Sequence, residues 1–236
     1  MSTLYLITAR GGSKGVPHKN LREIGGLSLV GWKAEVAKQV ITAHDDLIIS
    51  SDCPHILEVA AKHGVGVPFV RPAELATDTA SSADVIAHAL DYMNGDYSTV
   101  VLLEPSAPFT TPEHLVTALT MMDAKQAHLI VGMKHTEPHT TFIGEQPDDD
   151  FVTPIIVKMD RIGRNLRRQD LKQEWTFNGS LYVFNGLMFK QKQSIYGGAR
   201  NYGLLMDRWH SIEIDSMHDL EMALYAFDRG YVELPI

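Results

Sequence analysis

Three cationic side chains lie on one glycine-rich segment near the start of the chain. Arg10 and Lys14 flank Gly11-Gly12-Ser13, Lys19 follows soon after, and the apolar residues 4–7 come directly before the segment. A glycine-rich turn at the end of a strand exposes backbone N–H groups to phosphate oxygens, and nearby cations neutralise the phosphate charge. We therefore expect a site for a triphosphate here.

The spacing of this segment differs from the two common nucleotide-binding loops. Its glycine, lysine and hydroxyl residues do not fit G-x-x-x-x-G-K-[ST], and the fingerprint G-x-G-x-x-G is absent. An ordinary solvated turn with surface lysines is the alternative interpretation. Three cations on one loop that follows a buried strand favour phosphate binding over that alternative.

Other loops that follow predicted strands carry polar residues as well. Residues 50–52 read Ser-Ser-Asp, residues 71–82 include Arg71, Asp78 and Ser82, and Glu104 begins a turn with two prolines. In open α/β sheets, loops at the carboxyl ends of the strands form the ligand site. We expect the loop at 71–82 to hydrogen-bond a base or a ribose, although a helix cap alone would explain Ser82. A purely structural turn is an open alternative for Glu104.

Two carboxylates stand two residues apart near the end of the chain. Glu213 and Asp215 fall on either side of Ile214, in a segment whose pattern predicts a strand, so both side chains would point to one face. Mg²⁺ is held by one or two carboxylates together with substrate phosphates. We predict a Mg²⁺ site at Glu213 and Asp215, with an exposed strand face as the alternative.

Apolar runs alternate with helical patterns along most of the chain. Near-continuous apolar runs are typical of strands that are buried on both faces of a parallel sheet. The predicted strands are residues 4–8, 47–50, 67–70, 100–103, 129–133, 180–184 and 211–214. The predicted helices are residues 28–40, 54–63, 82–93, 112–122 and 217–229. The alternation predicts an α/β fold with a doubly wound, mostly parallel sheet.

The length of the chain predicts one domain. Its 236 residues, of which 44% are hydrophobic, can bury one sizeable core, so we expect a single domain over residues 1–236. The alternation breaks between about residues 134 and 175, where no clear core helix is expected. We expect this insertion to be an ordered arm that contacts a second subunit, because long structureless loops are uncommon in compact domains.

Composition excludes several classes of protein and site. Because 29 acidic residues outnumber 21 basic ones, we expect no nucleic-acid partner bound through a general basic surface. The single cysteine, Cys53, excludes an internal disulfide framework, and the eleven histidines lack the spacing of a zinc site. No apolar stretch approaches about 18 residues, so we expect a cytoplasmic protein with no membrane partner.

Several ordered motifs together resemble one enzyme family. They are Ala9-Arg10-Gly11-Gly12-Ser13-Lys14-Gly15 with Lys19-Asn20, Arg71-Pro72-Ala73-Glu74-Leu75-Ala76 with Asp78, Arg167-Arg168-Gln169-Asp170-Leu171, Asn178-Gly179-Ser180 with Tyr182, and Ile212-Glu213-Ile214-Asp215. Over nearly its whole length the chain resembles the acylneuraminate cytidylyltransferases, or CMP-sialic acid synthetases. These enzymes join CTP to a keto-acid sugar and release pyrophosphate, on a Rossmann-like nucleotidyltransferase fold.

The resemblance implies roles for individual residues. It makes Lys19, Arg10 and Asp215 catalytic, with Asp215 and Glu213 as the ligands of Mg²⁺. It places the nucleotide on Ala9, Arg10, Gly11, Gly12, Ser13, Lys14, Lys19, Asn20, Arg71, Asp78 and Ser82. It places the acceptor on Glu104, Arg168, Asn178 and Tyr182, with Arg168 contributed by the second subunit of a homodimer.

Departures from the family pattern concentrate on the sugar side. Glu104 stands where sialate-activating members usually have Gln, and its carboxylate would repel the carboxylate of a sialic acid unless it were protonated or paired. Glu213 stands where Asp is usual. The acceptor therefore stays open among sialic, legionaminic, pseudaminic and related keto-acid sugars, or a phosphonate. Further alternatives are a nucleotidyltransferase that uses another base and a non-catalytic nucleotide-binding regulator.

Overall fold

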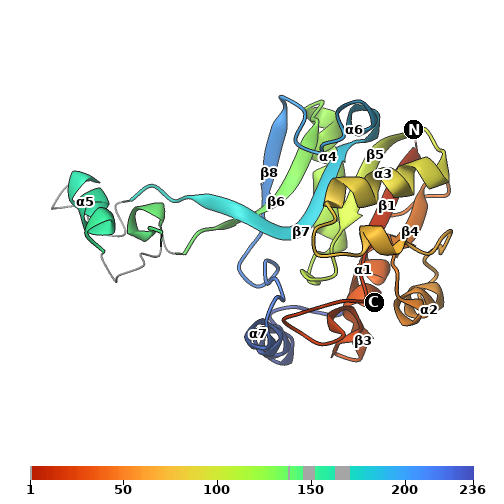
Figure 1. Cartoon of the computed structure of the whole chain (residues 1–236), viewed down its shortest axis with the longest axis horizontal. Coiled ribbons are helices and arrows are strands. Elements are labelled where there is room, and N and C mark those ends of the chain that lie inside the picture. Colours follow the sequence, from red (N-terminus) through yellow and green to blue (C-terminus); the bar gives the residue numbers. More distant parts are fainter. Residues whose placement is uncertain (1, 138, 146–151, 163–170) are drawn as a thin grey trace.

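A six-stranded sheet forms the centre of the computed structural model, which describes residues 2–137, 139–145, 152–162 and 171–236 (Figure 1). The strand order is β4 (Asp46–Ser50), β1 (Ser2–Thr8), β5 (Tyr97–Leu103), β7 (Trp175–Asn185), β6 (Leu129–His135) and β8 (Asn201–Leu205). The neighbours β4, β1 and β5 are parallel, as are β6 and β8, whereas β7 runs antiparallel to β5 and β6. The predicted α/β fold with a mostly parallel sheet is confirmed.

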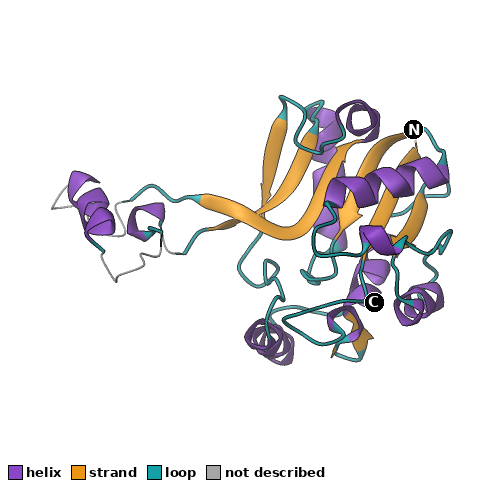
Figure 2. Cartoon of the chain, in the orientation of Figure 1, coloured by secondary structure: helices purple, strands orange, loops and turns teal. Residues whose placement is uncertain are grey.

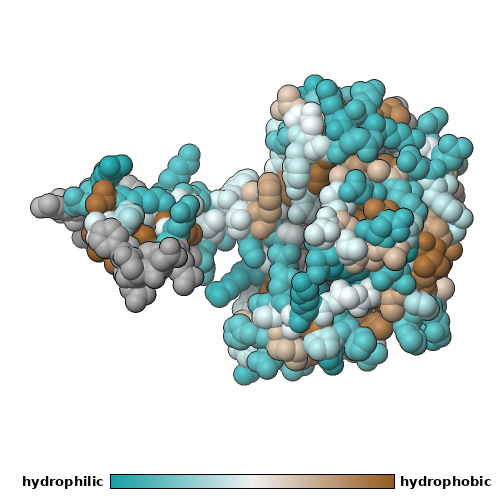
Figure 3. All heavy atoms as spheres, viewed as in Figure 1, coloured by the Kyte–Doolittle hydropathy of each residue, from teal (hydrophilic) through white to brown (hydrophobic). Residues whose placement is uncertain are grey.

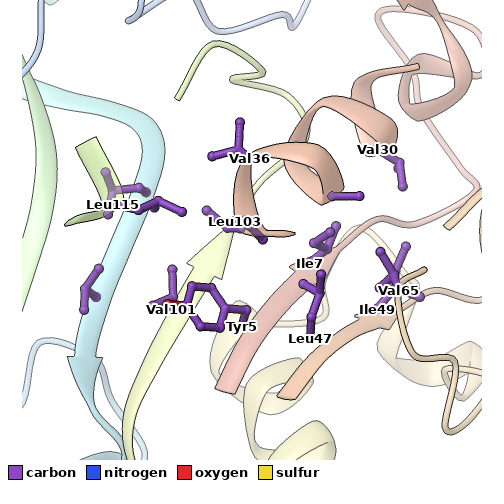
Figure 4. Packing of buried hydrophobic residues seen from close by; sticks show 14 of the residues in the cluster. Tyr5, Ile7, Val30, Val36, Leu47, Ile49, Val65, Val101, Leu103 and Leu115 are labelled. Atoms are coloured by element: carbon purple, nitrogen blue, oxygen red, sulfur yellow. The ribbon is translucent and has the colours of Figure 1, made fainter. Parts of the chain in front are cut away.

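Helices cover both faces of this sheet (Figure 2). One face carries α1 (Leu29–Lys38), α2 (Pro54–Lys62) and α4 (Pro112–Ala124), and the opposite face carries α3 (Ser82–Met93) and α6 (Gly186–Lys192). Figure 4 shows how side chains of α1 and α4 meet those of the central strands on the first face. In β4, β1, β5, β7 and β6, successive residues alternate between the two cores, as the period of two requires, so these strands are buried on both sides.

A third apolar cluster joins the two ends of the chain. It contains Trp32 of α1, Ile24 of the short hairpin β2 (Glu23–Ile24) and β3 (Leu27–Ser28), and Leu220 of the last helix, α7 (Met217–Asp228). Ile214 is buried in the same cluster. This packing fixes the segment before α7 beside the first loop of the chain. Three 3₁₀ turns, η1 (Lys19–Leu21), η2 (Ala73–Leu75) and η3 (Thr140–Phe142), complete the elements.

Side-chain caps explain where most helices begin. Ser28 accepts a hydrogen bond from the backbone N–H of Gly31 at the start of α1, and Thr111 and Ser216 form capping boxes at α4 and α7. The cap of α3 is Ser81, whereas Ser82 is the first helical residue. The explanation of Ser82 as a cap was therefore wrong by one residue, and its hydroxyl is not needed to start the helix.

The insertion between β6 and β7 projects away from the sheet as an arm (Figure 1). Its base is the end of the β6–β7 ladder, where His135 pairs with Trp175, and it carries η3 and a helix, α5 (Thr153–Ile162). The sequence predicted the excursion and no clear core helix within it, and the described side chains of α5 are exposed or only partly buried. The helix itself was not predicted, although Pro154 near its start and the helical spacing of Ile155, Ile156 and Met159 are signals for one.

Two predicted strands are absent from the structure, where residues 67–70 and 211–214 are both described. Pro68 lacks an N–H for a ladder, and Val67 and Val70 are exposed, so residues 67–70 form no strand. Residues 211–214 pack against α7 instead, and the Ile214 N–H donates to the Ser106 carbonyl. The sequence also missed β8 and α6. Along the described part of the chain, no helix combines the length and the apolar character needed to cross a bilayer.

Candidate functional site

The carboxyl ends of three parallel strands meet at one edge of the sheet. Thr8 of β1 pairs with Ser50 of β4, and Ile7 pairs with Leu103 of β5, so the loops that follow these strands start side by side. They are the loops whose polar residues predicted a ligand site. The structure brings them together around three adjoining pockets.

The first loop lines a pocket of about 340 Å³, which we call the cationic pocket. Its lining residues come from the first loop, the turn after β5 and the segment before α7: Thr8, Arg10, Gly12, Ser13, Lys14, Gly15, Lys19, Asn20, Glu104, Pro105, Ser106 and Asp215. Most of the predicted triphosphate-binding residues therefore share one cavity. Ala9 and Gly11 lie behind it, since Ala9 is buried and the Gly11 N–H donates to the Asp52 carboxylate at 2.8 Å.

Arg10 and Lys14 both bind the carboxylate of Asp78. Arg10 Nη1 lies 2.7 Å from Asp78 Oδ1, and Lys14 Nζ lies 2.6 Å from Asp78 Oδ2. These two cations hold the pKa of Asp78 below its ordinary value. Both cations can therefore bind the two oxygens of a single anionic group, which is the geometry that a phosphate presents.

Lys19 joins the first loop to the far end of the chain. Its Nζ donates to the Ile214 carbonyl at 2.7 Å and lies 3.1 Å from Asp215 Oδ1. The backbone of Gly15 also lies close to the end of the chain, because a Cβ at this position would lie 1.8 Å from the Asp215 carbonyl oxygen. The Asn20 side chain holds the loop from within by donating to the Arg10 carbonyl at 2.9 Å.

Arg71 lines a second cavity of about 250 Å³, the Arg71 pocket. Its guanidinium donates from Nε to Ser50 Oγ at 3.0 Å and from Nη2 to the Ser50 carbonyl at 2.5 Å, and burial lowers its pKa to about 10. The lining set is Thr8, Arg10, Arg71, Leu75, Thr77, Asp78, Ala80, Ser82, Val85 and Glu104. The predicted nucleotide residues Arg71, Asp78 and Ser82 thus surround one pocket that adjoins the cationic pocket through Arg10.

A third cavity, of about 270 Å³, lies beside Tyr182 and Tyr196 and is mostly apolar; we call it the tyrosine pocket. Its lining is Ser82, Ala83, Ile86, Leu102, Glu104, Tyr182, Gln193, Ser194, Ile195 and Tyr196. Glu104 lines all three pockets. Burial and the carboxylate of Glu213 raise the pKa of Glu104 to about 6, against the opposing effect of Lys33 and Lys19.

Glu213 and Asp215 lie near each other without forming a strand. Burial, together with the Asp215 carboxylate, raises the pKa of Glu213. Gly179, at φ +66°, leaves room for this side chain, since a Cβ there would lie 2.5 Å from Glu213 Oε1. Two neighbouring carboxylates beside a cationic pocket are a chemically suitable donor set for a divalent cation. Among the described residues, no group of three or more His, Cys, Asp or Glu could hold a metal by itself.

Two residues predicted to bind the acceptor line none of the three pockets among the described residues. Asn178 is fully buried, and its side chain donates to Ser211 Oγ at 3.0 Å and accepts from Ser180 Oγ at 2.7 Å. Its role as a ligand contact stays a prediction, and in the structure its side chain is hydrogen-bonded within the protein. Arg168 lies outside the described residues.

Two residues at or behind the pockets were not predicted from the sequence. Tyr196 follows α6 in a segment without a predicted element, so nothing local placed it beside Tyr182. Lys33 lies among apolar residues of α1 and is fully buried, with its amine on Thr110 and Ser180. A lysine inside an apolar helical run is an available signal, since a buried lysine needs a partner.

Comparison with known proteins identifies relatives of the chain. The family model described as "Cytidylyltransferase" matches residues 4–225. The chain is 30% identical over 226 residues to the post-translational flagellin modification protein B of Campylobacter coli, covering 93% of this chain and 92% of that protein. It is 28% identical over 224 residues to the N-acylneuraminate cytidylyltransferase of Escherichia coli, covering 94% of this chain and 51% of that protein.

A solved structure has the same fold. The chain superimposes on CMP:2-keto-3-deoxy-manno-octonic acid synthetase, determined in complex with CTP, with a TM-score of 0.67 at 14% identity. The match covers 98% of this chain and all of that one. The likeness therefore extends across the sheet and its helices, while the sequence at most positions differs.

Proposed function

Because the chain belongs to the cytidylyltransferase family and is a nucleotidyltransferase, we propose that it transfers CMP from CTP to the anomeric hydroxyl of a keto-acid sugar and releases pyrophosphate. The single observation that carries this proposal is the meeting of the three pockets at Glu104. A cationic cavity, a polar cavity with a buried arginine and an apolar cavity with two tyrosines suit a triphosphate, a nucleoside and a sugar respectively.

The triphosphate belongs in the cationic pocket. Arg10 and Lys14 already hold both oxygens of one carboxylate, and Gly12 faces open space there, since a Cβ on it would meet nothing within 4 Å. Phosphate oxygens bind exposed backbone N–H groups and cations in such loops. With its triphosphate there, CTP would place its nucleoside in the adjoining Arg71 pocket.

The reaction is an in-line displacement at the α-phosphorus. A bond forms from the sugar hydroxyl oxygen to the α-phosphorus, the bond to the β-phosphate oxygen breaks, and the hydroxyl proton passes to a carboxylate of the site or to water. Negative charge develops on the phosphoryl oxygens and on the leaving pyrophosphate. Lys19 and Arg10 line the cationic pocket and would stabilise that charge, because preorganised cations need no reorientation during the reaction.

Mg²⁺ is the cofactor that we propose for this site. Asp215 and Glu213 would hold it together with phosphate oxygens of the substrate, since Mg²⁺ accepts few protein ligands and keeps oxygen ligands from its substrate. When bound, it would neutralise phosphate charge and lower the pKa of the oxygens on it. Lys19 restricts where the Asp215 carboxylate can lie through the contact at 3.1 Å.

The acceptor belongs in the tyrosine pocket. Apolar side chains such as Ile86 and Leu102 would pack on the carbon skeleton of the sugar, and Tyr182 would supply a hydroxyl. Glu104 would accept hydrogen bonds from the acceptor rather than face its carboxylate, because two carboxylates at close range repel each other. This favours an acceptor that presents hydroxyl groups to Glu104.

A homodimer through the arm completes the proposal. The arm and the strand at its base expose large apolar side chains: Ile156 is 56% exposed, Val157 42%, Met159 41%, Trp175 50% and Phe177 52%. Figure 3 shows apolar residues among hydrophilic ones on the projecting arm. Exposed apolar surface of this kind marks protein–protein contacts, and a second copy of the chain is the partner we propose. A cytoplasmic location stays a prediction from the sequence.

Pyrophosphate release tests the reaction. The chain should release pyrophosphate with CTP and a keto-acid sugar, and little with ATP, GTP or UTP, when sialic, legionaminic and pseudaminic acids and a small phosphonate are offered in turn. Asp215→Asn should abolish the dependence of the rate on Mg²⁺ concentration, whereas Asp91→Asn, on the exposed surface of α3, should leave it intact. Release that is indifferent to the base would contradict the assignment of CTP.

The mass of the protein in solution tests the dimer. Ile156→Glu places a charge on the exposed face of the arm and should convert a dimer to a monomer in analytical ultracentrifugation. Val116→Glu, at an apolar position of α4 that is 51% exposed, is the matched control and should leave the mass unchanged. A wild-type protein that sediments as a monomer at high concentration would contradict the dimer.

A further inference from the structure

Lys33 is a fully buried lysine behind the three pockets. It lies in the middle of α1, with 0% of its surface exposed, between residues such as Val30 and Ala34 that belong to the apolar core. Burial lowers its pKa to about 7, and the negative charge of Glu104 works in the opposite direction. A buried amine of this kind destabilises the fold relative to an apolar side chain of similar size.

The amine joins two segments that are far apart in the sequence. Its Nζ donates to Thr110 Oγ1 at 2.5 Å and to the Ser180 carbonyl at 3.0 Å, and Thr110 Oγ1 in turn donates to the same carbonyl at 3.2 Å. The result is a closed triangle of hydrogen bonds. It links α1 to the end of the turn after β5 and to the middle of β7.

Both segments carry residues of the site. Thr110 ends the turn that begins at Glu104, and the Ser106 carbonyl in this turn accepts from the Ile214 N–H at 2.7 Å. Ser180 follows Gly179, whose missing Cβ makes room for Glu213. A displacement of the triangle would therefore move Glu104 relative to the tyrosine pocket.

The charge of Lys33 also acts on Glu104. The carboxylate of Glu104 is largely buried, and two cations oppose the effect of that burial, of which Lys33 acts more strongly than Lys19. Lys19 is occupied by the Ile214 carbonyl and Asp215, whereas Lys33 is fully buried in the core. Glu104 is thus influenced by a buried amine, protonated below about pH 7, that no substrate can reach.

We infer that Lys33 is a positioning residue of the acceptor side of the site, which holds the turn of Glu104 against β7 and supplies a buried positive charge to the Glu104 carboxylate. This inference rests on the proposed function. It predicts a larger effect on the acceptor than on CTP. The turn residues Glu104, Pro105 and Ser106 also line the cationic pocket, but the cations of the first loop, which would bind the triphosphate, make no hydrogen bond to Lys33 among the described residues. Lys33 acts through Glu104 and touches neither substrate.

Steady-state kinetics with both substrates tests the inference. Lys33→Met keeps the length of the side chain and removes the amine, so the KM for the acceptor should rise roughly 10-fold while the KM for CTP changes less than about 2-fold. Lys38→Met, on the exposed end of the same helix, is the matched control and should change neither value. Equal changes in both KM values, or no change in the acceptor KM, would overturn the inference.

A double substitution separates positioning from general loss of structure. In a Glu104→Gln background, Lys33→Met should raise the acceptor KM by less than about 3-fold, because the carboxylate through which Lys33 acts is gone. Additive effects of the two substitutions would contradict a role through Glu104.

Thr110 gives a second route if Lys33→Met does not fold. Thr110→Val removes the hydroxyl of the triangle and Thr110→Ser retains it, so the first should raise the acceptor KM and the second should restore it toward the wild-type value. Equal acceptor KM values in these two variants would overturn the inference.

Failure of the proposed function would be recognised separately. If the wild-type protein released no pyrophosphate with any acceptor, the proposed function would fail while the positioning role could still be decided by crystallography. Crystal structures of the wild type and of Thr110→Val should then differ in the position of residues 104–110. Superimposable turns would overturn the positioning role.

Discussion

The cationic pocket and the tyrosine pocket meet at Glu104 but differ in the charge and burial of the residues that line them. In the cationic pocket, Lys14 is 82% exposed and Arg10 37%, and their partner is another exposed charge, Asp78. The tyrosine pocket is lined mainly by apolar side chains, and its carboxylate is largely buried. Exposed charges are well suited to attract a polyanion, whereas a buried apolar cavity discriminates by shape.

This difference predicts how substitutions in each pocket affect catalysis and stability. Solvent weakens individual exposed ion pairs, so their loss should alter catalysis more than folding. Buried groups on the acceptor side are coupled to packing, so their loss should alter substrate choice and stability together. Substitutions on either side can test this contrast.

The largest effect is expected on the cationic side. Lys19→Ala removes a positioned charge and should lower kcat by roughly 100-fold or more, since one preorganised electrostatic group typically contributes that much. Steady-state pyrophosphate release measures the loss, and Lys62→Ala, an exposed lysine paired with Glu58 on α2, should keep the wild-type rate. A near-normal kcat for Lys19→Ala would remove the basis for the cationic pocket as the reacting centre.

The contact between the first loop and the segment before α7 should be sensitive to one methyl group. Gly15→Ala would place a Cβ 1.8 Å from the Asp215 carbonyl oxygen, so the two backbones must separate, at a destabilisation of about 1–3 kcal/mol. Thermal unfolding measures it. Gly12→Ala, whose Cβ meets nothing within 4 Å, should unfold at the wild-type temperature. Equal melting temperatures for the two variants would mean that the approach at Gly15 is not close in solution.

The acceptor side should respond in KM rather than in folding. Tyr196 is 54% exposed and lines the tyrosine pocket, so Tyr196→Ala should raise the acceptor KM roughly 10-fold and leave the KM for CTP unchanged. Tyr92→Ala is a matched control, because Tyr92 is 55% exposed on α3 and lines none of the three pockets. A change confined to the KM for CTP would reverse the assignment of the two pockets.

The buried lysine should make stability depend on pH. The pKa of Lys33 is about 7 in the folded protein and about 10.4 in an unfolded chain, so between these values the unfolded state binds more protons and stability rises with pH. The free energy of unfolding of the wild type, relative to Lys33→Met, should therefore increase between about pH 7 and 10. Its slope should be at most about 1.4 kcal/mol per pH unit. Chemical denaturation at several pH values measures the slope, and parallel curves for the two proteins would show that Lys33 is not buried as an amine.

The smallest effect concerns the exposed ion pairs of Asp78. Asp78→Asn removes the partner of Arg10 and Lys14, yet the melting temperature should stay at the wild-type value because exposed pairs contribute little to stability. Thermal unfolding at low and high salt measures this. A drop as large as that expected for Gly15→Ala would show that the first loop depends on Asp78 for its fold.

Local patterns were sufficient for much of the fold. Apolar runs identified β1, β4, β5 and β6 because these strands are buried on both faces. They failed at residues 67–70, where Pro68 and exposed valines break the ladder, and at β8, whose residues are all exposed or only partly buried. The helix α5 was not predicted either, although its apolar residues follow a helical spacing.

Local patterns also identified one part of the site and failed at another. The cationic loop could be recognised from one continuous segment, because glycine and cations at close spacing carry their chemistry locally. The tyrosine pocket combines Ile86, Glu104, Tyr182 and Tyr196, and no stretch of sequence shows that these four meet. The burial of Asn178 could not be predicted for a related reason, because its motif does not say which way its side chain lies.

The order of residues alone determined an α/β chain with a cationic, glycine-rich loop after its first strand, since strand burial and the composition of a loop depend on neighbours along the backbone. Tertiary structure decided the meeting of Glu104 with both tyrosines, the amine of Lys33 behind it and the approach of Asp215 to Gly15. These arrangements depend on how helices pack on a sheet and how strands are ordered within it. Such contacts join residues up to about 200 positions apart, as between Gly15 and Asp215, over which local patterns carry no information.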